Sequence, residues 1–200
     1  WMQALATPRV APGLRFDVLA AARRARGAAP DLERLVAAYD AGLAGSKDPL
    51  APYQIAMDGG SAERGAQVFN SHPVAQCTRC HAVNGQGGVA GPDLSHIASA
   101  LNRHDLLEAL IVPSARIAPG YGLTTLTIRD GTTVTGVVVA ESATAVDLEV
   151  TKGTKTSIAT SDITGRTKPL SLMPPMGGSL QPRELRDVLA YVQSLRAHIK

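Results

Sequence analysis

The chain has 200 residues, of which 44% are hydrophobic and only 4% aromatic, and its formal net charge is +3. This length allows one or two domains with a substantial core, and the few aromatic residues leave room in that core for a large apolar cofactor. The basic residues are scattered, which excludes a nucleic-acid-binding patch. No apolar run of about 18 residues predicts a transmembrane helix. The chain starts at Trp1 without a visible signal peptide, so we expect a processed chain or a fragment of a longer one.

Two helices are expected before Gly60. The first covers about residues 16–26 and is rich in alanine. The second covers residues 31–43 because five apolar side chains recur there on one helical face: Leu32, Leu35, Val36, Tyr39 and Leu43. Residues 27–30 form the turn between them, and residues 47–49 end the second helix. The pattern predicts a helical hairpin.

Two further helices are expected in the middle of the chain. Ser61 is a suitable N-cap for a short helix that carries Val68 and Phe69. A second helix covers residues 104–112, with Asn102 as its candidate cap, and Pro113 ends it.

Both cysteines of the chain lie in one segment, Cys77-Thr78-Arg79-Cys80-His81. A disulfide here would close a very small loop and stabilise little. A thioredoxin-like redox pair requires a βαβ context, whereas these flanks are rich in Ala, Gly and Pro. Structural zinc requires four ligands, and no second cysteine pair exists. The fourth interpretation is covalent haem attachment, for which C-x-x-C-H is the signature: the two thiols add to the vinyl groups and His81 is the proximal iron ligand.

A glycine-rich loop follows the motif at residues 84–95. Glycine lets the backbone approach a flat ligand closely, so this loop is expected to wrap one haem edge. Pro92 fixes the chain near His81, where a carbonyl can accept the Nδ1 proton and orient the ligating ring. Without the cysteine motif, the same residues would indicate an ordinary flexible loop.

The sixth iron ligand must come from another segment, and residues 170–178 offer two thioethers in a rigid Pro- and Gly-rich loop. A thioether suits haem iron and raises its reduction potential, although a lone methionine usually packs in a core. We expect Met173 to be the ligand, because Met173-Pro174 presents the sulfur from an extended backbone, and we hold Met176 in reserve. A second histidine is the alternative ligand, with four candidates: His72, His96, His104 and His198.

Between these two motifs the hydrophobic period changes from helical to two. Strands are expected at residues 123–129, 132–140, 146–151 and around 155–160, and Asp130-Gly131 is a hairpin turn signal. The pattern predicts a small antiparallel module that covers one side of the haem or extends the fold. A last helix begins at Pro182 and has apolar residues on one face: Leu185, Val188, Leu189, Val192 and Leu195.

The order of helix, C-x-x-C-H, Gly-Pro-Asp-Leu loop, Met-Pro loop and helix resembles a class I cytochrome c. More narrowly, about residues 59–196 resemble the haem-binding domain at the C-terminus of large secreted proteins of planctomycetes and verrucomicrobia. The segments that carry this resemblance are residues 63–69, 91–95, 111–114, 120–121, 171–174 and 183–187. In that family a sorbosone-dehydrogenase-like propeller and HEAT-like helices commonly precede the domain. No propeller lies in this chain, so dehydrogenase activity is not assigned to it.

The expected fold is α+β, a mainly helical class I cytochrome c fold with a β insert at about residues 121–168. Residues 1–58 are expected to form a HEAT-like helical segment, and residues 59–200 the cytochrome c domain. The resemblance implies one covalent haem c held by Cys77, Cys80, His81 and Met173, and the loop residues themselves add Pro92 to the expected cofactor-binding set.

The expected activity is one-electron transfer to redox partner proteins, in a larger redox protein or complex. The resemblance places this activity in the periplasm or elsewhere outside the cytoplasm. Two alternatives stay open: a haem enzyme or gas sensor with an open distal position, and a haem-free zinc or disulfide module.

Overall fold

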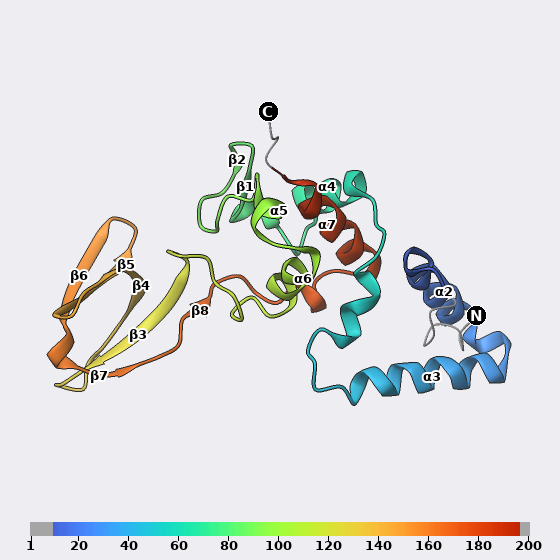
Figure 1. The fold of residues 1–200 in the computed structure, drawn as a ribbon, viewed down its shortest axis with the longest axis horizontal. Coiled ribbons are helices and arrows are strands. Elements are labelled where there is room, and N and C mark those ends of the chain that lie inside the picture. The colour runs from blue at the N-terminus through green and yellow to red at the C-terminus, as the bar shows by residue number, and fades with distance from the viewer. Residues whose placement is uncertain (1–9, 197–200) are drawn as a thin grey trace.

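The computed structural model describes residues 10–196, and it arranges them in three parts along the long axis of the molecule (Figure 1). A helical hairpin lies at one end, a helical body in the middle and an antiparallel sheet at the other end. Among the described residues, no helix has both the length and the hydrophobicity that a membrane crossing requires.

The hairpin consists of α2 (Pro12–Ala25) and α3 (Pro30–Ala44), joined by the 3₁₀ turn η1 (Arg26–Ala28). This confirms the expected pair of helices, but α2 starts earlier than predicted because proline suits the first helical turn. The two helices share a small core around Leu19, Ala22 and Val36. Leu43 was expected on the same face, but it lies outside this core.

The helical body is built around the crossing of α4 (Ala62–Ser71) with α7 (Pro182–Ser194). Gly65 allows the close approach, because a Cβ at this position would overlap the carbonyl oxygen of Asp187. Beside the crossing, the rings of Phe69 and Tyr191 pack with centroids 5.4 Å apart. Ser61 caps α4 by accepting a hydrogen bond from the Arg64 amide, as predicted.

An ion pair reinforces this crossing. Asp187 is only 2% exposed and accepts hydrogen bonds from the Ser61 amide at 2.8 Å and from Nε of Arg64 at 2.8 Å. Burial by itself would raise the pKa of Asp187. The hydrogen bonds from Arg64 and Ser61 and the Arg64 charge outweigh it, so the net shift of that pKa is downward.

The other helices of the body are short and pack on α4 and α7. They are η2 (Ala51–Ala56), η3 (Cys77–Arg79), α5 (Ile97–Ala100), α6 (Arg103–Ile111) and η5 (Met176–Gly178). Asn102 caps α6, as predicted. Leu50 and Ala56 lie in the same core as Leu107 and Leu189. The packing of the body therefore starts before the boundary expected between residues 58 and 59.

The sheet is formed by consecutive strands between α6 and α7. These are β3 (Gly122–Ile128), β4 (Thr133–Glu141), β5 (Ala145–Thr151), β6 (Thr154–Ala159), β7 (Ile163–Arg166) and β8 (Leu170–Ser171), with η4 (Thr160–Asp162) before β7. The order is β6-β5-β4-β3-β7, and β8 also pairs with β3. The first four strands were predicted, whereas β7 and β8 were not, because both are short and lack a clear period of two.

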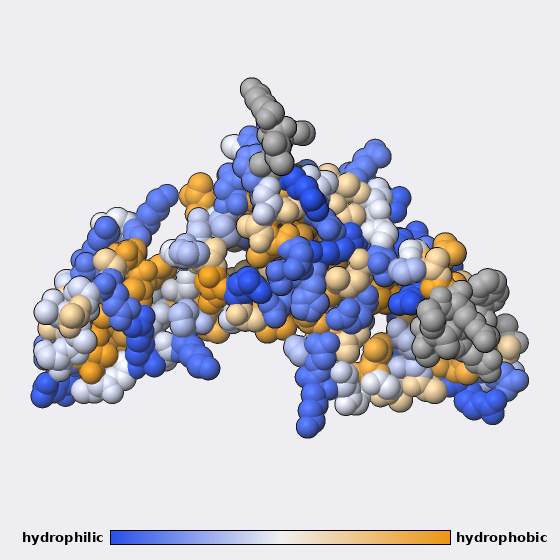
Figure 2. Space-filling model, viewed as in Figure 1, coloured by the Kyte–Doolittle hydropathy of each residue, from blue (hydrophilic) through white to orange (hydrophobic). Residues whose placement is uncertain are grey.

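The sheet has a core of its own around Leu126, Val146, Leu148 and Ile158. Apolar residues also reach the surface of the sheet, and Figure 2 shows them there as well as over the helical body. The sheet stands beside the body (Figure 1). Strand β8 pairs with β3 and leads directly into the methionine loop, so the sheet holds the start of that loop.

Candidate functional site

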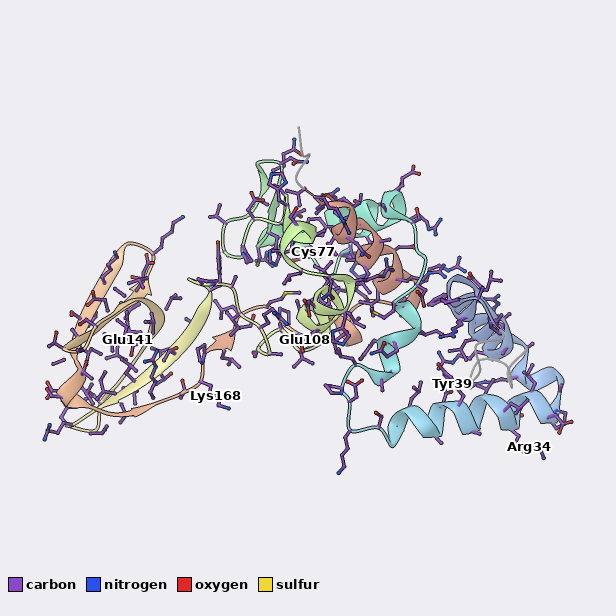
Figure 3. The ribbon with its side chains drawn as sticks, viewed as in Figure 1. Arg34, Tyr39, Cys77, Glu108, Glu141 and Lys168 are labelled. Carbon is purple, nitrogen blue, oxygen red and sulfur yellow. The ribbon has the colours of Figure 1, made fainter. Side chains whose placement is uncertain are left out.

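The two cysteines and His81 lie on one tight turn, and Figure 3 shows Cys77 in the helical body. Gln76 adopts the left-handed conformation, and η3 follows it. The amides of Cys80 and His81 both donate to the Cys77 carbonyl, at 3.2 and 2.9 Å. Both cysteines are free thiols; Cys77 is half-buried against the core and Cys80 is exposed. The turn therefore presents two unpaired thiols immediately before the histidine.

His81 is buried, with 9% of its surface exposed. Its Nδ1 lies 2.8 Å from the Pro92 carbonyl oxygen. A carbonyl can only accept, so Nδ1 carries the proton and Nε2 keeps the lone pair that a metal requires. Gly91 lies against the ring: a Cβ there would be 2.7 Å from Cε1 of His81.

The glycine-rich loop is tied to the cysteine motif by backbone hydrogen bonds. Gly88 donates to Thr78, Gly91 to Cys80 and Leu94 to Ala82, at 2.8, 2.7 and 2.8 Å. Within it, β1 (Ala82–Val83) and β2 (Gln86–Gly87) form a small hairpin that was not predicted. These hydrogen bonds fix the loop beside His81.

The thiols show no sign of a metal cluster among their described neighbours. Within residues 10–196, no three His, Cys, Asp or Glu side chains come together in an arrangement that could hold a metal ion. Burial raises the pKa of the Cys77 thiol, and the neighbouring Cys80 raises it further, despite a backbone hydrogen bond that lowers it. Cys77 is therefore held as a thiol against an apolar surface.

The structure distinguishes the two candidate methionines. Met176 is 4% exposed and forms part of the helical core. Met173 is half-buried and packs against the edge of the same core. The preceding residue, Leu172, is 68% exposed. Of these two methionines, Met173 is therefore the one whose side chain is partly exposed.

Three of the four alternative histidines are described, and each has a local environment of its own. His72 follows α4, and its Nδ1 accepts hydrogen bonds from the amides of Val74 and Ala75. His104 is exposed beside Asp105, and His96 is exposed before α5. His198 lies outside the described residues.

The surroundings of Cys77 suit a flat apolar cofactor. Like Cys77, six other hydrophobic side chains pack against the helical core while staying partly exposed: Ala75, Val83, Leu94, Ile97, Leu101 and Met173. Together with two free thiols and an oriented imidazole, these residues fit a haem better than an isolated ion, because a macrocycle would cover the apolar edge.

A covalent attachment motif, an oriented histidine and an apolar edge are the features of a c-type cytochrome. The Cytochrome c family model matches residues 62–135, which supports a class I c-type cytochrome. The match covers less than half of the chain; it includes Cys77, Cys80, His81 and Pro92 and ends before Met173. A cytochrome c domain implies covalently bound haem c and generally serves in electron transfer. No curated protein matched the chain.

Proposed function

We propose that the protein carries single electrons on one haem c, attached at Cys77 and Cys80 and ligated by His81 and Met173. His81 directly follows the C-x-x-C segment, and the observation that carries this proposal is the contact between its Nδ1 and the Pro92 carbonyl. It leaves Nε2 as the basic atom, and a hydrogen bond of this kind strengthens and orients a histidine ligand.

Each residue of the site has a distinct part in this function. When bound, the haem supplies a one-electron ferric–ferrous couple. Cys77 and Cys80 hold it in both states, and Pro92 keeps the His81 ring from rotating. Because Met176 is already used in the core, withdrawing it would leave a cavity that costs about 2–5 kcal/mol, and this favours Met173 as the distal ligand. A thioether ligand and an apolar site both favour the reduced form.

We further propose that the chain works in a larger redox protein or complex outside the cytoplasm. The narrower resemblance to the planctomycete and verrucomicrobial haem-binding domain supports this, together with the helical hairpin that precedes the body. In this proposal residues 1–58 continue a HEAT-like region, and the strands inserted before the methionine loop extend the cytochrome fold.

The first test is the intact mass of the purified protein after acid–acetone extraction. A covalent haem would survive the extraction and add its full mass, and Cys77→Ser with Cys80→Ser should abolish that addition. A colourless protein of unmodified mass would overturn the proposal and favour the zinc or disulfide alternative.

The second test concerns the distal ligand. We expect Met173→Ala to remove the weak long-wavelength charge-transfer band of methionine-ligated ferric haem and to lower the potential. Met176→Ala is the matched control and should keep the band while reducing stability. Rapid carbon monoxide binding by the unaltered reduced protein would instead indicate an open distal position, as in a haem enzyme or gas sensor.

A further inference from the structure

We propose that Ser171 and Tyr53 are positioning residues that hold the Met173 loop from its two ends. This inference rests on the proposed ligation by Met173. It adds a role for residues before and after the segment matched by the Cytochrome c family model, residues 62–135.

The first anchor is a short chain of hydrogen bonds on the N-terminal side of Met173. The Ser171 amide donates to Oγ of Ser114 at 3.1 Å, and the Met173 amide donates to Oγ of Ser171 at 3.1 Å. Ser114 closely follows α6, whose Leu110 and Ile111 are in the helical core. The backbone of Met173 is therefore linked through two serines to the segment that follows α6, a helix with one side in the core.

This link matters because the following residues cannot replace it. Pro174 and Pro175 have no backbone N–H, so the Met173 amide is the only backbone donor within residues 173–175. Strand β8 holds the same part of the chain by a second contact: Ser171 pairs with Gly122, and Leu170 with Leu123, at the start of β3. The sheet thus fixes the chain immediately before the proposed ligand.

The second anchor is a steric contact on the C-terminal side. A Cβ on Gly177 would overlap Oη of Tyr53 and lie 2.5 Å from its Cζ. Gly177 is not among the described residues with positive φ, so glycine is needed here for space and not for backbone conformation. Tyr53 belongs to η2, and its neighbours Leu50 and Ala56 share the core with Met176. The tyrosine ring therefore lies directly against the end of the loop.

Together the two anchors restrict residues 171–177, which contain the proposed ligand. A ligand held in its bound geometry loses little conformational freedom on coordination, so preorganisation strengthens its bond to iron. Loosening either end should make Met173 easier to displace, without affecting haem attachment at Cys77 and Cys80.

The test is a titration of the ferric holoprotein with imidazole, which competes with methionine for iron. We expect Ser171→Ala and Gly177→Ala each to bind imidazole about fivefold more tightly than the unaltered protein, the equivalent of about one net hydrogen bond. Ser171→Thr keeps the acceptor and should restore the original affinity. Gly178→Ala is the control for Gly177→Ala, because a Cβ at Gly178 meets no atom within 4 Å.

A double variant tests the contact itself. Tyr53→Ala vacates the space that a Cβ at position 177 would occupy, so adding Gly177→Ala to it should cause no further change in imidazole affinity. Additive effects of the two substitutions would overturn the Tyr53 contact, as would an equal effect of Gly178→Ala.

The result for the unaltered protein separates this inference from the proposed function. If its ferric spectrum lacks the methionine charge-transfer band, the proposed ligation by Met173 fails, and with it the positioning role. If the band is present but Ser171→Ala and Gly177→Ala bind imidazole like the unaltered protein, the positioning role alone is refuted. Circular dichroism and intact mass should show that each variant is folded and carries haem.

Discussion

The crossing of α4 and α7 offers a sharp test of the packing, through the substitution Gly65→Ala. A Cβ at this position would overlap the Asp187 carbonyl oxygen and lie 2.7 Å from Cβ of Tyr191. Non-bonded carbon atoms are optimally about 3.5–4.0 Å apart. One added methyl group must therefore push the two helices apart.

Three effects determine the size of the destabilisation. Forcing a methyl group into a close-packed contact costs about 1–3 kcal/mol. Separating the helices also weakens the packing of Phe69 on Tyr191, and such a ring pair contributes about 0.5–1.5 kcal/mol. Alanine in place of glycine gains up to about 1 kcal/mol of helix propensity. The net expectation is a loss of about 2 kcal/mol in the free energy of unfolding.

Gly42→Ala in α3 is the matched control, because a Cβ there meets no atom within 4 Å. This substitution keeps the gain in helix propensity without the clash, so it should leave stability unchanged or raise it by up to about 1 kcal/mol. The assay is chemical denaturation of the holoprotein followed by circular dichroism. Equal stabilisation by Gly65→Ala and Gly42→Ala would refute the close helix crossing.

Three other substitutions test the acid response, the sheet and the histidine. The pKa of Asp187 is lowered in the folded state, so its pairing with Arg64 stabilises the protein above the unfolded pKa, about 3.9, and is lost as the pH falls below it. Asp187→Asn should therefore lower stability near neutral pH and reduce its loss on acidification; an unchanged acid-unfolding curve would contradict this. Leu148→Ala should cost about 2–5 kcal/mol in the sheet, measured by thermal unfolding, and leave the haem spectrum intact. Gly91→Ala should displace the His81 ring from Pro92 and alter the reduction potential in a redox titration, whereas an unchanged potential would argue against the contact.

Local patterns in the sequence predicted much of the fold. The hairpin helices, the caps Ser61 and Asn102, and strands β3 to β6 were all expected, because periodicity, capping and turn residues act over a few neighbouring positions. Strands β7 and β8 escaped prediction, since both depend on pairing with β3. A strand of two to four residues carries too little pattern of its own to be recognised.

The functional site also combines features that are local in the sequence with features that depend on distant segments. The sequence by itself predicted haem attachment at Cys77, Cys80 and His81, because C-x-x-C-H is a local pattern that spans only five adjacent positions. Only the tertiary structure decided which carbonyl orients His81, which methionine is buried and which residues face Gly177. These properties arise from contacts between segments far apart in the chain, where packing, and not local preference, determines which atoms meet.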